Sequence, residues 1–183
     1  IAALMPTTLK GVFDSILRIG KLVDKDKEAG KLVNSMKNKF REIEKRIKNK
    51  IENNQSVASQ QKLQLGLAVL PHRSPSPIYN NKKIKKHRIY IEEWHKPPTV
   101  SGNWIPTLVK IAGGDYGLIK AGVHSREVTT SQIQKYDPET IIISICGMAD
   151  KAPKEWVTKR EGWQDLSAVK NNNVFVFDDS LLN

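Results

Sequence analysis

Apolar side chains in the first fifty residues recur at the spacing of amphipathic helices. After Thr7 and Thr8, either of which can cap a helix through its side-chain oxygen, the pattern predicts a helix that ends near residue 20. Residues 4–5 resemble the end of a preceding strand. A second apolar stripe, with steps of three and four residues, predicts another helix over residues 24–51. At 1.5 Å per residue this helix would be about 40 Å long, which exceeds the diameter of a small domain.

Residues 53–87 break this periodicity. They are polar and low in complexity at first, and then basic and interrupted by prolines, although residues 63–70 could form a strand. This composition predicts a linker or an insertion. The chain is therefore expected to have three parts, which are residues 1–52 with the long helix, residues 53–87, and an αβ lobe over residues 88–183.

From Arg88 onward, strand-like and helix-like patterns alternate. Residues 140–145 are nearly all β-branched and apolar, which suits a strand covered on both faces, as in a parallel sheet. Gly113 and Gly114 follow a helical pattern and are typical of a helix end. The sequence therefore predicts an α/β fold, a three-layer αβα lobe with a mostly parallel sheet, preceded by the long helix. The expected strands are 88–92, 140–145 and 174–177, and the expected helices are 103–112, 130–136 and 163–170.

The loops after the three predicted strands should meet along one edge of the sheet, because the carboxyl ends of parallel strands lie side by side. These loops are residues 94–103, 146–153 and 178–183, and the turn 122–130 should lie beside them. Together they carry aromatic and polar side chains that suit a bulky ligand. The residues expected at this rim are Trp94, His95, Trp104, His124, Arg126, Cys146 and Met148.

Known catalytic motifs are absent from the sequence. It contains no phosphate-binding loop, no dinucleotide-binding glycine pattern and no nucleophile elbow. Cys146 with His95 or His124 could form a nucleophile–base pair or a metal site, but a small buried cysteine at a strand end is the commoner case. Glu92 and Glu93 are adjacent in a predicted strand, so they point to opposite faces and cannot act as a carboxylate pair. We therefore predict that the chain is not an enzyme and has no metal or cofactor of its own.

The formal charge of +11 raises the alternative of a protein that binds nucleic acid or an anionic surface. Residues 10–50 contain 13 basic and 6 acidic side chains, a net +7, and residues 82–88 add +5. The remaining residues together carry −1, the difference between +11 and +12. The positive charge thus belongs to one helical face and one loop, and the only aromatic residue of the basic helix, Phe40, belongs to its apolar stripe. Nucleic acid is not the expected partner, and binding through the basic helix remains the alternative function.

Three segments in combination resemble the C-terminal lobe of the cobalamin and ferric-siderophore substrate-binding proteins of ABC importers. They are RIYIEEWHKPPTVSGNWIPTLVKIAGG, SREVTTSQIQKYDPETIIISICGM and WQDLSAVKNNNVFVFDD. The segment MPTTLKGVFDSILRIGKLVDKDKEAGKLVNSM is similar to the passage from the first lobe of that family into its rigid inter-lobe helix. The resemblance covers about residues 1–50 and 88–183. It implies a C-terminal half of a two-lobed protein, in which residues 1–52 hold the end of the first lobe and the inter-lobe helix.

The resemblance also implies a function in import. Members of this family hold a ligand between their lobes and deliver it to an ABC permease. The Cys-Gly after the strand resembles the cobalamin branch, so the expected ligand is cobalamin or a similar large metal chelate, such as an iron-siderophore or a haem-like molecule. The implied location is extracytoplasmic, in the periplasm or tethered to the outer face of the cell membrane.

The ligand contacts of the family fall mainly on the loop of residues 94–104. One family aromatic that contacts cobalamin corresponds to Thr99, where Trp94 or Trp104 could take its place, and a second family aromatic corresponds to Ser125. The glutamate that docks on the permease corresponds to Ser131, and Glu127 is the nearby acidic alternative. The predicted ligand-binding residues are Trp94, His95, Thr99, Trp104, Ser125 and Arg126.

Overall fold

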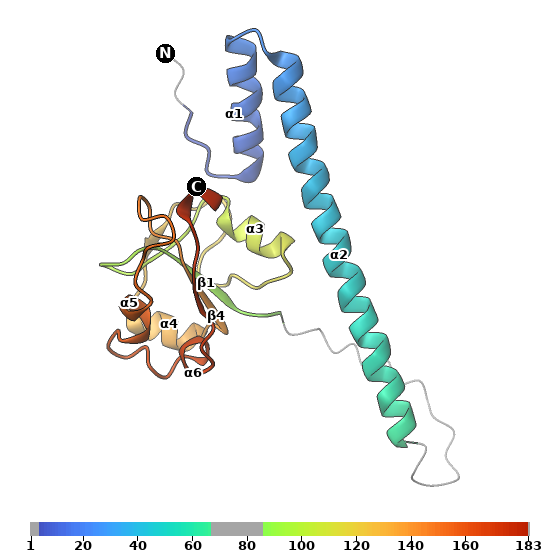
Figure 1. Cartoon of the computed structure of the whole chain (residues 1–183), viewed down its shortest axis with the longest axis vertical. Helices are drawn as coiled ribbons and strands as arrows, with labels where there is room; N and C mark the ends of the chain where they lie inside the picture. Colours follow the sequence, from blue (N-terminus) through green and yellow to red (C-terminus); the bar gives the residue numbers. More distant parts are fainter. Residues whose placement is uncertain (1–3, 67–85, 183) are drawn as a thin grey trace.

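The computed structural model describes residues 4–66 and 86–182, and its N-terminal part is a hairpin of two helices (Figure 1). The first helix, α1 (Leu9–Leu22), begins as predicted. Thr8 is its N-cap, and the Thr8 side chain accepts a hydrogen bond from the Gly11 amide at 3.0 Å. Residues 4–6 form no strand, which corrects the expectation for that segment, because a strand needs a partner and no described strand pairs with them.

The second helix, α2 (Asp26–Gly66), has 41 residues and is about 60 Å long at 1.5 Å per residue. It continues well beyond the predicted end at residue 51, so residues 53–66 are helical and do not belong to an irregular linker. The polar composition of this stretch was misleading, because no proline or glycine interrupts it before Gly66. The possible strand at residues 63–70 is helical in its first half, and its second half lies outside the described residues with the rest of residues 67–85.

The two helices of the hairpin pack closely where the chain turns. Gly20 of α1 faces Ala29 of α2, and a Cβ atom at position 20 would lie 2.4 Å from the Ala29 Cβ. Further along, the Phe13 and Phe40 rings lie 6.2 Å apart between their centroids. Part of the predicted apolar stripe, with Ala29 and Phe40, therefore lies where the two helices meet, whereas Leu32 and Ile43 of the same stripe are exposed.

The C-terminal lobe is built on a five-stranded sheet with the order β3-β2-β1-β4-β5. β1, β4 and β5 are parallel, as predicted, with Ile89 opposite Thr140 and Ile141 opposite Val174. β2 and β3 are two short antiparallel strands that extend the sheet at one edge, and the sequence pattern did not reveal them. The strands are β1 (Ile89–Trp94), β2 (Thr99–Val100), β3 (Arg126–Glu127), β4 (Thr140–Ile143) and β5 (Val174–Val176).

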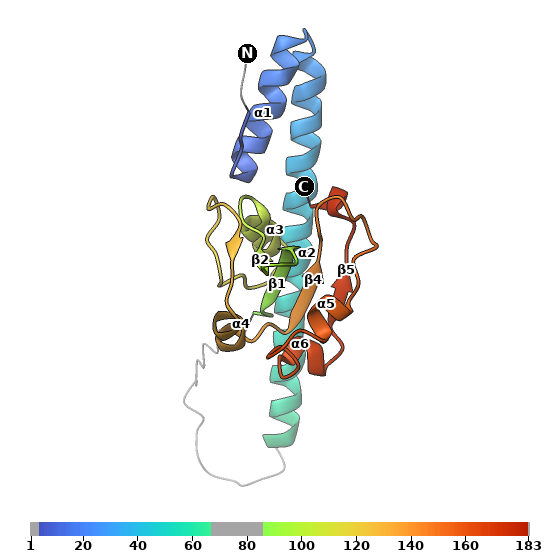
Figure 2. The same ribbon diagram turned by 90° about the vertical axis from the view of Figure 1, so that its left-hand side faces the viewer.

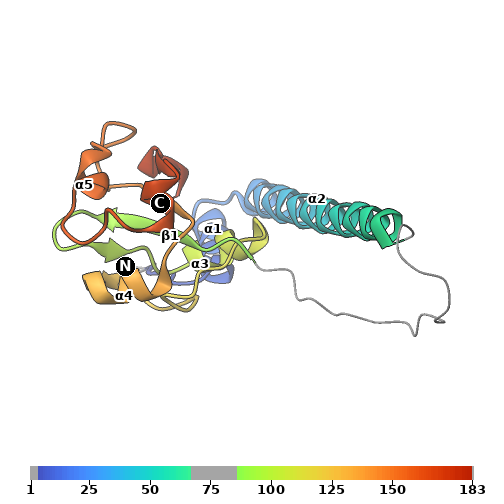
Figure 3. The ribbon, with the colours of Figure 1, turned by 90° about the horizontal axis from the view of Figure 1, so that it is seen from below.

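Helical segments cover both faces of this sheet, which confirms the three-layer α/β lobe (Figures 2 and 3). Alternate residues of β1 point to opposite faces. On one face, the Tyr90 ring meets Trp163, which lies between α5 and α6, at 5.6 Å between centroids. On the other face, Ile89 lies beside Gly114, which follows α3. The helices are α3 (Ile105–Ile111), α4 (Thr130–Tyr136), α5 (Glu155–Thr158), α6 (Ser167–Lys170) and the 3-10 turn η1 (Asp179–Leu181).

The long helix contacts the lobe at the end of α3 and then diverges from it (Figures 1 and 3). Gly113 has a φ of +84°, and a Cβ atom there would lie 2.7 Å from Cγ2 of Ile47 in α2. Glycine is required here for two reasons, the left-handed backbone after the helix and the close approach of α2. Of the helices in residues 4–66 and 86–182, none combines the length and apolar character that a bilayer crossing needs.

Candidate ligand-binding site

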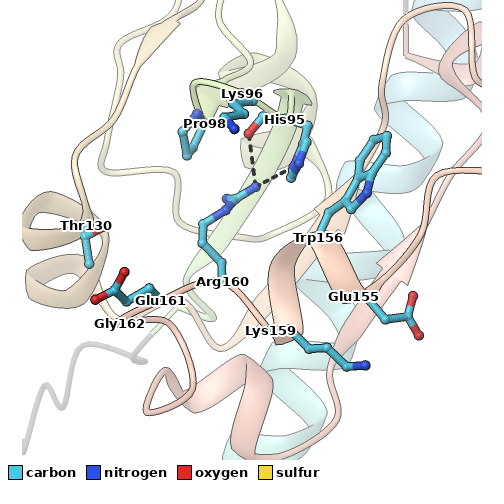
Figure 4. A pocket seen from close by; sticks show the side chains of 10 residues that line it. All are labelled: His95, Lys96, Pro98, Thr130, Glu155, Trp156, Lys159, Arg160, Glu161 and Gly162. Carbon is cyan, nitrogen blue, oxygen red and sulfur yellow. Dashed lines mark hydrogen bonds between the residues drawn. The ribbon is translucent and has the colours of Figure 1, made fainter.

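Two adjoining pockets open beside the loop that follows β1. They share His95, Lys96 and Trp156. The larger pocket has a volume of about 860 Å³ and is drawn in Figure 4. The smaller pocket measures about 210 Å³ and is the more apolar of the two. The larger one is lined by His95, Lys96, Pro98, Thr130, Glu155, Trp156, Lys159, Arg160, Glu161 and Gly162.

A stacked pair of rings stands between the two pockets. The imidazole of His95 lies 4.1 Å from the Trp156 ring centroid at an interplanar angle of 20°. His95 comes from the loop after β1, and Trp156 from α5, so the stack joins two elements that are distant in sequence (Figure 4). A flat face with one polar edge is thereby fixed at the carboxyl end of the sheet, where ligands of α/β proteins bind.

A buried ion pair holds the His95–Trp156 stack in position. Glu92 of β1 is fully buried, and both of its carboxylate oxygens accept hydrogen bonds from Arg160, at 2.6 and 2.8 Å. The Tyr90 hydroxyl donates a third bond to the same carboxylate at 3.1 Å. Burial raises the pKa of the Glu92 carboxyl, and the hydrogen bonds and charge of Arg160 oppose that rise. Such a bidentate pair holds both side chains in one geometry.

Arg160 also fixes His95. Its Nη2 atom lies 2.9 Å from Nδ1 of His95 and 3.2 Å from the His95 carbonyl oxygen (Figure 4). The guanidinium carbon also lies 4.2 Å from the centroid of the buried Trp163 ring, which makes a cation–π contact. Burial, together with the nearby charges of Arg160 and Lys96, lowers the pKa of His95, so its ring stays neutral to a lower pH than usual.

The smaller pocket is formed by apolar side chains from the ends of β1 and β4. Trp94 is 51% exposed, and it lines this pocket with Ile145, Cys146 and Met148. Cys146 is exposed, which corrects the expectation of a buried cysteine. It lies past the end of β4, where the chain has left the covered part of the sheet. The predicted gathering of Trp94, His95, Cys146 and Met148 at one rim is therefore confirmed.

The loop that carries Cys146 and Met148 is held by a carboxylate from the end of the chain. Asp179 accepts hydrogen bonds from the amides of Gly147 and Ala149, at 2.9 and 3.0 Å. Both donor residues have positive φ angles, +78° and +50°, so their amides converge on one acceptor. These two hydrogen bonds link the loop after β4 to η1.

The other predicted ligand-binding residues lie outside both pockets. The Trp104 indole N–H donates to the Leu182 carbonyl at 2.9 Å, and its ring packs against the core. Thr99 lies in β2, and its hydroxyl donates to the Pro97 carbonyl at 3.0 Å. The Ser125 hydroxyl donates to Glu93 and accepts from the Gly102 amide. These polar groups already have partners inside the protein, so their assignment to ligand binding stays a prediction.

Three predicted residues lie on β3 and the adjoining helix α4. Arg126 donates to the Leu118 carbonyl at 2.8 Å. Glu127 is exposed at the edge of the sheet, and Ser131 is exposed in the first turn of α4. His124, which was expected at the rim, is exposed but lines neither pocket. The docking assignment for Glu127 and Ser131 is a prediction that their exposure permits.

Sequence reasoning missed the residues that build the larger pocket, above all Trp156 and Arg160. Arg160 lies 68 positions from Glu92, and no periodic pattern connects them. One signal was available, because a glutamate among the apolar residues of a central strand needs a partner when it is buried. The opposite orientation of Glu92 and Glu93 was predicted correctly, since Glu92 meets Arg160 and Glu93 meets Ser125. Among the described residues, no group of three His, Cys, Asp or Glu could hold a metal ion.

Comparison with known proteins gives a consistent picture. A family model described as periplasmic binding protein matches residues 82–181, more than half of the chain. A search among curated proteins finds no match. Among solved structures, an ABC transporter substrate-binding protein from Listeria monocytogenes EGD-e has a TM-score of 0.67 at 22% identity, and the match covers 100% of this chain and 60% of that one.

Two further structures share the fold. A structure from Saccharomonospora viridis DSM 43017, described as an ABC-type Fe3+-hydroxamate transport system, gives a TM-score of 0.63 at 18% identity and covers 96% of this chain and 50% of that one. IsdE of S. aureus, complexed with heme, gives 0.63 at 20% identity and covers 96% and 58%. The chain thus spans between half and two thirds of the length of these proteins. Because the family model matches most of the αβ lobe and the solved structures share its architecture, the chain belongs to the periplasmic binding protein family.

Proposed function

We propose that this chain acts in an ABC importer as part of a substrate-binding protein, and that its C-terminal lobe forms one side of the binding site for a large metal chelate. One observation carries this proposal, the pair of pockets at the carboxyl end of β1 around the His95–Trp156 stack. Exposed ring faces offer a broad apolar contact, while Lys96 and Lys159 add charged groups at the edge. This combination suits a wide, rigid ligand with polar groups on its periphery.

The solved relatives narrow the ligand class. Proteins with this fold are described as parts of a ferric-hydroxamate transport system or as complexes with heme. We propose an iron-hydroxamate, a haem-like molecule or a corrinoid such as cobalamin as the ligand. No reaction is needed for this role, so the chain is proposed not to be an enzyme.

The same proposal assigns a partner and a location. The ligand would be passed to an ABC permease, and Glu127 and Ser131 are the exposed candidates for that contact. The protein would act outside the cytoplasm, in the periplasm or held at the outer face of the membrane. An exposed ion pair contributes only about 0–1 kcal/mol, so docking on a permease would require several such contacts.

The four tryptophans provide a direct test, because each indole N–H gives its own NMR signal. The 15N-labelled chain is titrated with desferrioxamine B loaded with Ga3+, with cyanocobalamin and with haem in separate experiments. At least one ligand should shift the signals of Trp94 and Trp156, which line the pockets. The signals of Trp163, which is buried, and Trp104, which is bonded to Leu182, should stay in place.

A pair of variants provides the control. Trp94→Ala should lower the affinity for the ligand about tenfold, because the exposed half of the Trp94 side chain no longer makes apolar contact with the ligand. Phe175→Ala removes another exposed aromatic, on β5, and should leave the affinity unchanged. Absence of any shift with all three ligands would contradict the proposed function.

A further inference from the structure

The contact between Arg160 and His95 determines where the imidazole carries its proton. Nη2 of Arg160 lies 2.9 Å from Nδ1 of His95. A guanidinium has only donors and does not lose its proton in proteins, so Nδ1 must accept this hydrogen bond with its lone pair. In the neutral ring, the single proton is therefore on Nε2.

The surroundings of His95 preserve this state. A carboxylate oxygen of Glu92 lies 3.9 Å from Nδ1, and both oxygens of this carboxylate are already bonded to Arg160. Lys96 and Arg160 add positive charge beside the ring, and Trp156 covers one face. Among the residues that the structure describes, none forms a hydrogen bond with Nε2. The side chain is 29% exposed and lines both pockets.

We propose that His95 binds the chelate as a hydrogen-bond donor, from Nε2–H to an oxygen atom of the ligand, and that it does not coordinate the metal. Coordination through Nε2 would require its lone pair, so the proton would have to leave or move to Nδ1. A proton on Nδ1 would point at the Arg160 N–H donor 2.9 Å away. This inference rests on the proposed function and specifies how the ligand would be bound.

The donor role favours one class of ligand over another. A ferric hydroxamate fills the coordination sphere of its iron with its own oxygen atoms and presents those oxygens and its amide carbonyls as acceptors. Haem has open axial positions and is commonly held through a histidine or another side chain that binds the iron. The geometry therefore favours a chelate in which the ligand's own oxygen atoms fill every coordination position of the metal. His95 would donate its hydrogen bond to an acceptor atom on the surface of that chelate.

The first test measures the protonation of the ring without any ligand. Long-range 15N–1H NMR of the whole chain at pH 7 should show an unprotonated Nδ1 and a protonated Nε2 for His95. A proton on Nδ1 alone, or on both nitrogens, would overturn the inference. His95→Gln identifies the signal, because it is lost in that variant.

The second test uses two ligand probes and two variants. With Ga3+-loaded desferrioxamine B, His95→Ala should weaken binding about threefold to tenfold, the usual effect of one neutral hydrogen bond. His95→Gln keeps an amide N–H donor at a similar reach and should recover most of this loss. With ferric haem, the absorption spectrum should be the same for the parent chain and for His95→Ala.

The outcomes separate this inference from the proposed function. If the parent chain binds the hydroxamate and His95→Ala binds equally well, the donor role is wrong and the proposed function stands. A haem spectrum with a nitrogen-ligated iron that disappears in His95→Ala would also overturn the donor role while supporting transport of a chelate. If the parent chain binds neither probe nor cyanocobalamin, both the proposed function and the donor role are wrong.

Discussion

At the scale of single residues, Glu92 and Arg160 form an ion pair that is shielded from solvent. Glu92 is fully buried and Arg160 is 13% exposed. Removing the guanidinium would leave a carboxylate without its counter-charge in the core. We expect Arg160→Met to lower the free energy of unfolding by about 3–5 kcal/mol, measured by urea denaturation with tryptophan fluorescence.

Two controls separate the ion pair from a general effect of the substitution. Lys159→Met removes a neighbouring exposed cation and should change the stability by less than about 0.5 kcal/mol. Glu92→Met combined with Arg160→Met removes both charges and should recover most of the loss. If the Arg160→Met protein is as stable as the parent, Glu92 and Arg160 do not form a buried ion pair.

The residue scale is also where prediction from the sequence succeeded least. Trp94 and His95 were placed correctly at the pocket, because a loop after a parallel strand must reach the rim of the sheet. Trp104 is in the same loop region, yet its indole N–H is bonded to the Leu182 carbonyl. That bond depends on where the end of the chain folds, which no local sequence pattern indicates. Trp156 and Arg160 were missed because their contacts with β1 and its loop also join residues that are distant in sequence.

At the scale of elements, Gly20 and Gly30 of the helical hairpin have opposite roles. Gly20 of α1 lies against Ala29, and a Cβ atom there would lie 2.4 Å from its neighbour, whereas Gly30 of α2 has no atom within 4 Å of such a Cβ. Gly20→Ala should therefore destabilise the chain by about 1–3 kcal/mol through overpacking. Gly30→Ala should stabilise it by about 0.5–1 kcal/mol, because alanine loses less backbone freedom in a helix.

Thermal unfolding followed by circular dichroism at the helix band measures both changes. The two variants carry the same chemical substitution in neighbouring parts of one hairpin, so each is the control for the other. Equal effects of the two would mean that the helices do not pack at Gly20.

Most elements were predictable because their periodicity is strong. The helix at residues 130–136 and the three parallel strands were found within one or two residues at most of their ends. β2 and β3 have two residues each, too few for any period to appear. The continuation of α2 to Gly66 was missed because polarity was taken as a sign of irregular structure, although polar residues such as glutamine and lysine favour helices.

At the scale of the whole molecule, the α/β class, the long helix and the family were predicted correctly. The three-part division of the chain stays a prediction except at residues 53–66, which continue the long helix, and the roles of individual residues stay predictions. The comparisons do not favour the alternative of a nucleic-acid binder. The restriction to cobalamin also stays a prediction, since the relatives described with ligands include hydroxamate and heme proteins.

The attachment of α2 to the lobe can be tested at Gly113. Alanine at this position must adopt a φ of +84° and would also place Cβ 2.7 Å from Ile47. Gly147 has a similar φ of +78° but no atom within 4 Å. Gly147→Ala should therefore cost about 1–2 kcal/mol for the left-handed backbone alone. Gly113→Ala should cost more, because the contact with α2 is lost as well.

A second substitution tests whether the additional cost of Gly113→Ala comes from the contact with Ile47. In an Ile47→Ala background, Gly113→Ala should cost only as much as Gly147→Ala costs in the parent chain, as measured by urea denaturation. A Gly113→Ala protein no less stable than Gly147→Ala would mean that α2 does not rest on the end of α3.

Ile47, which contacts Gly113, lies near the middle of α2. A stiff rod held at such a point behaves as a lever, with one arm of about 30 Å reaching to the start of the helix. A tilt of only about 5° at this fulcrum would swing that end by about 3 Å. A small change in how one methyl group sits on one glycine is therefore amplified into a displacement of the entire helical hairpin.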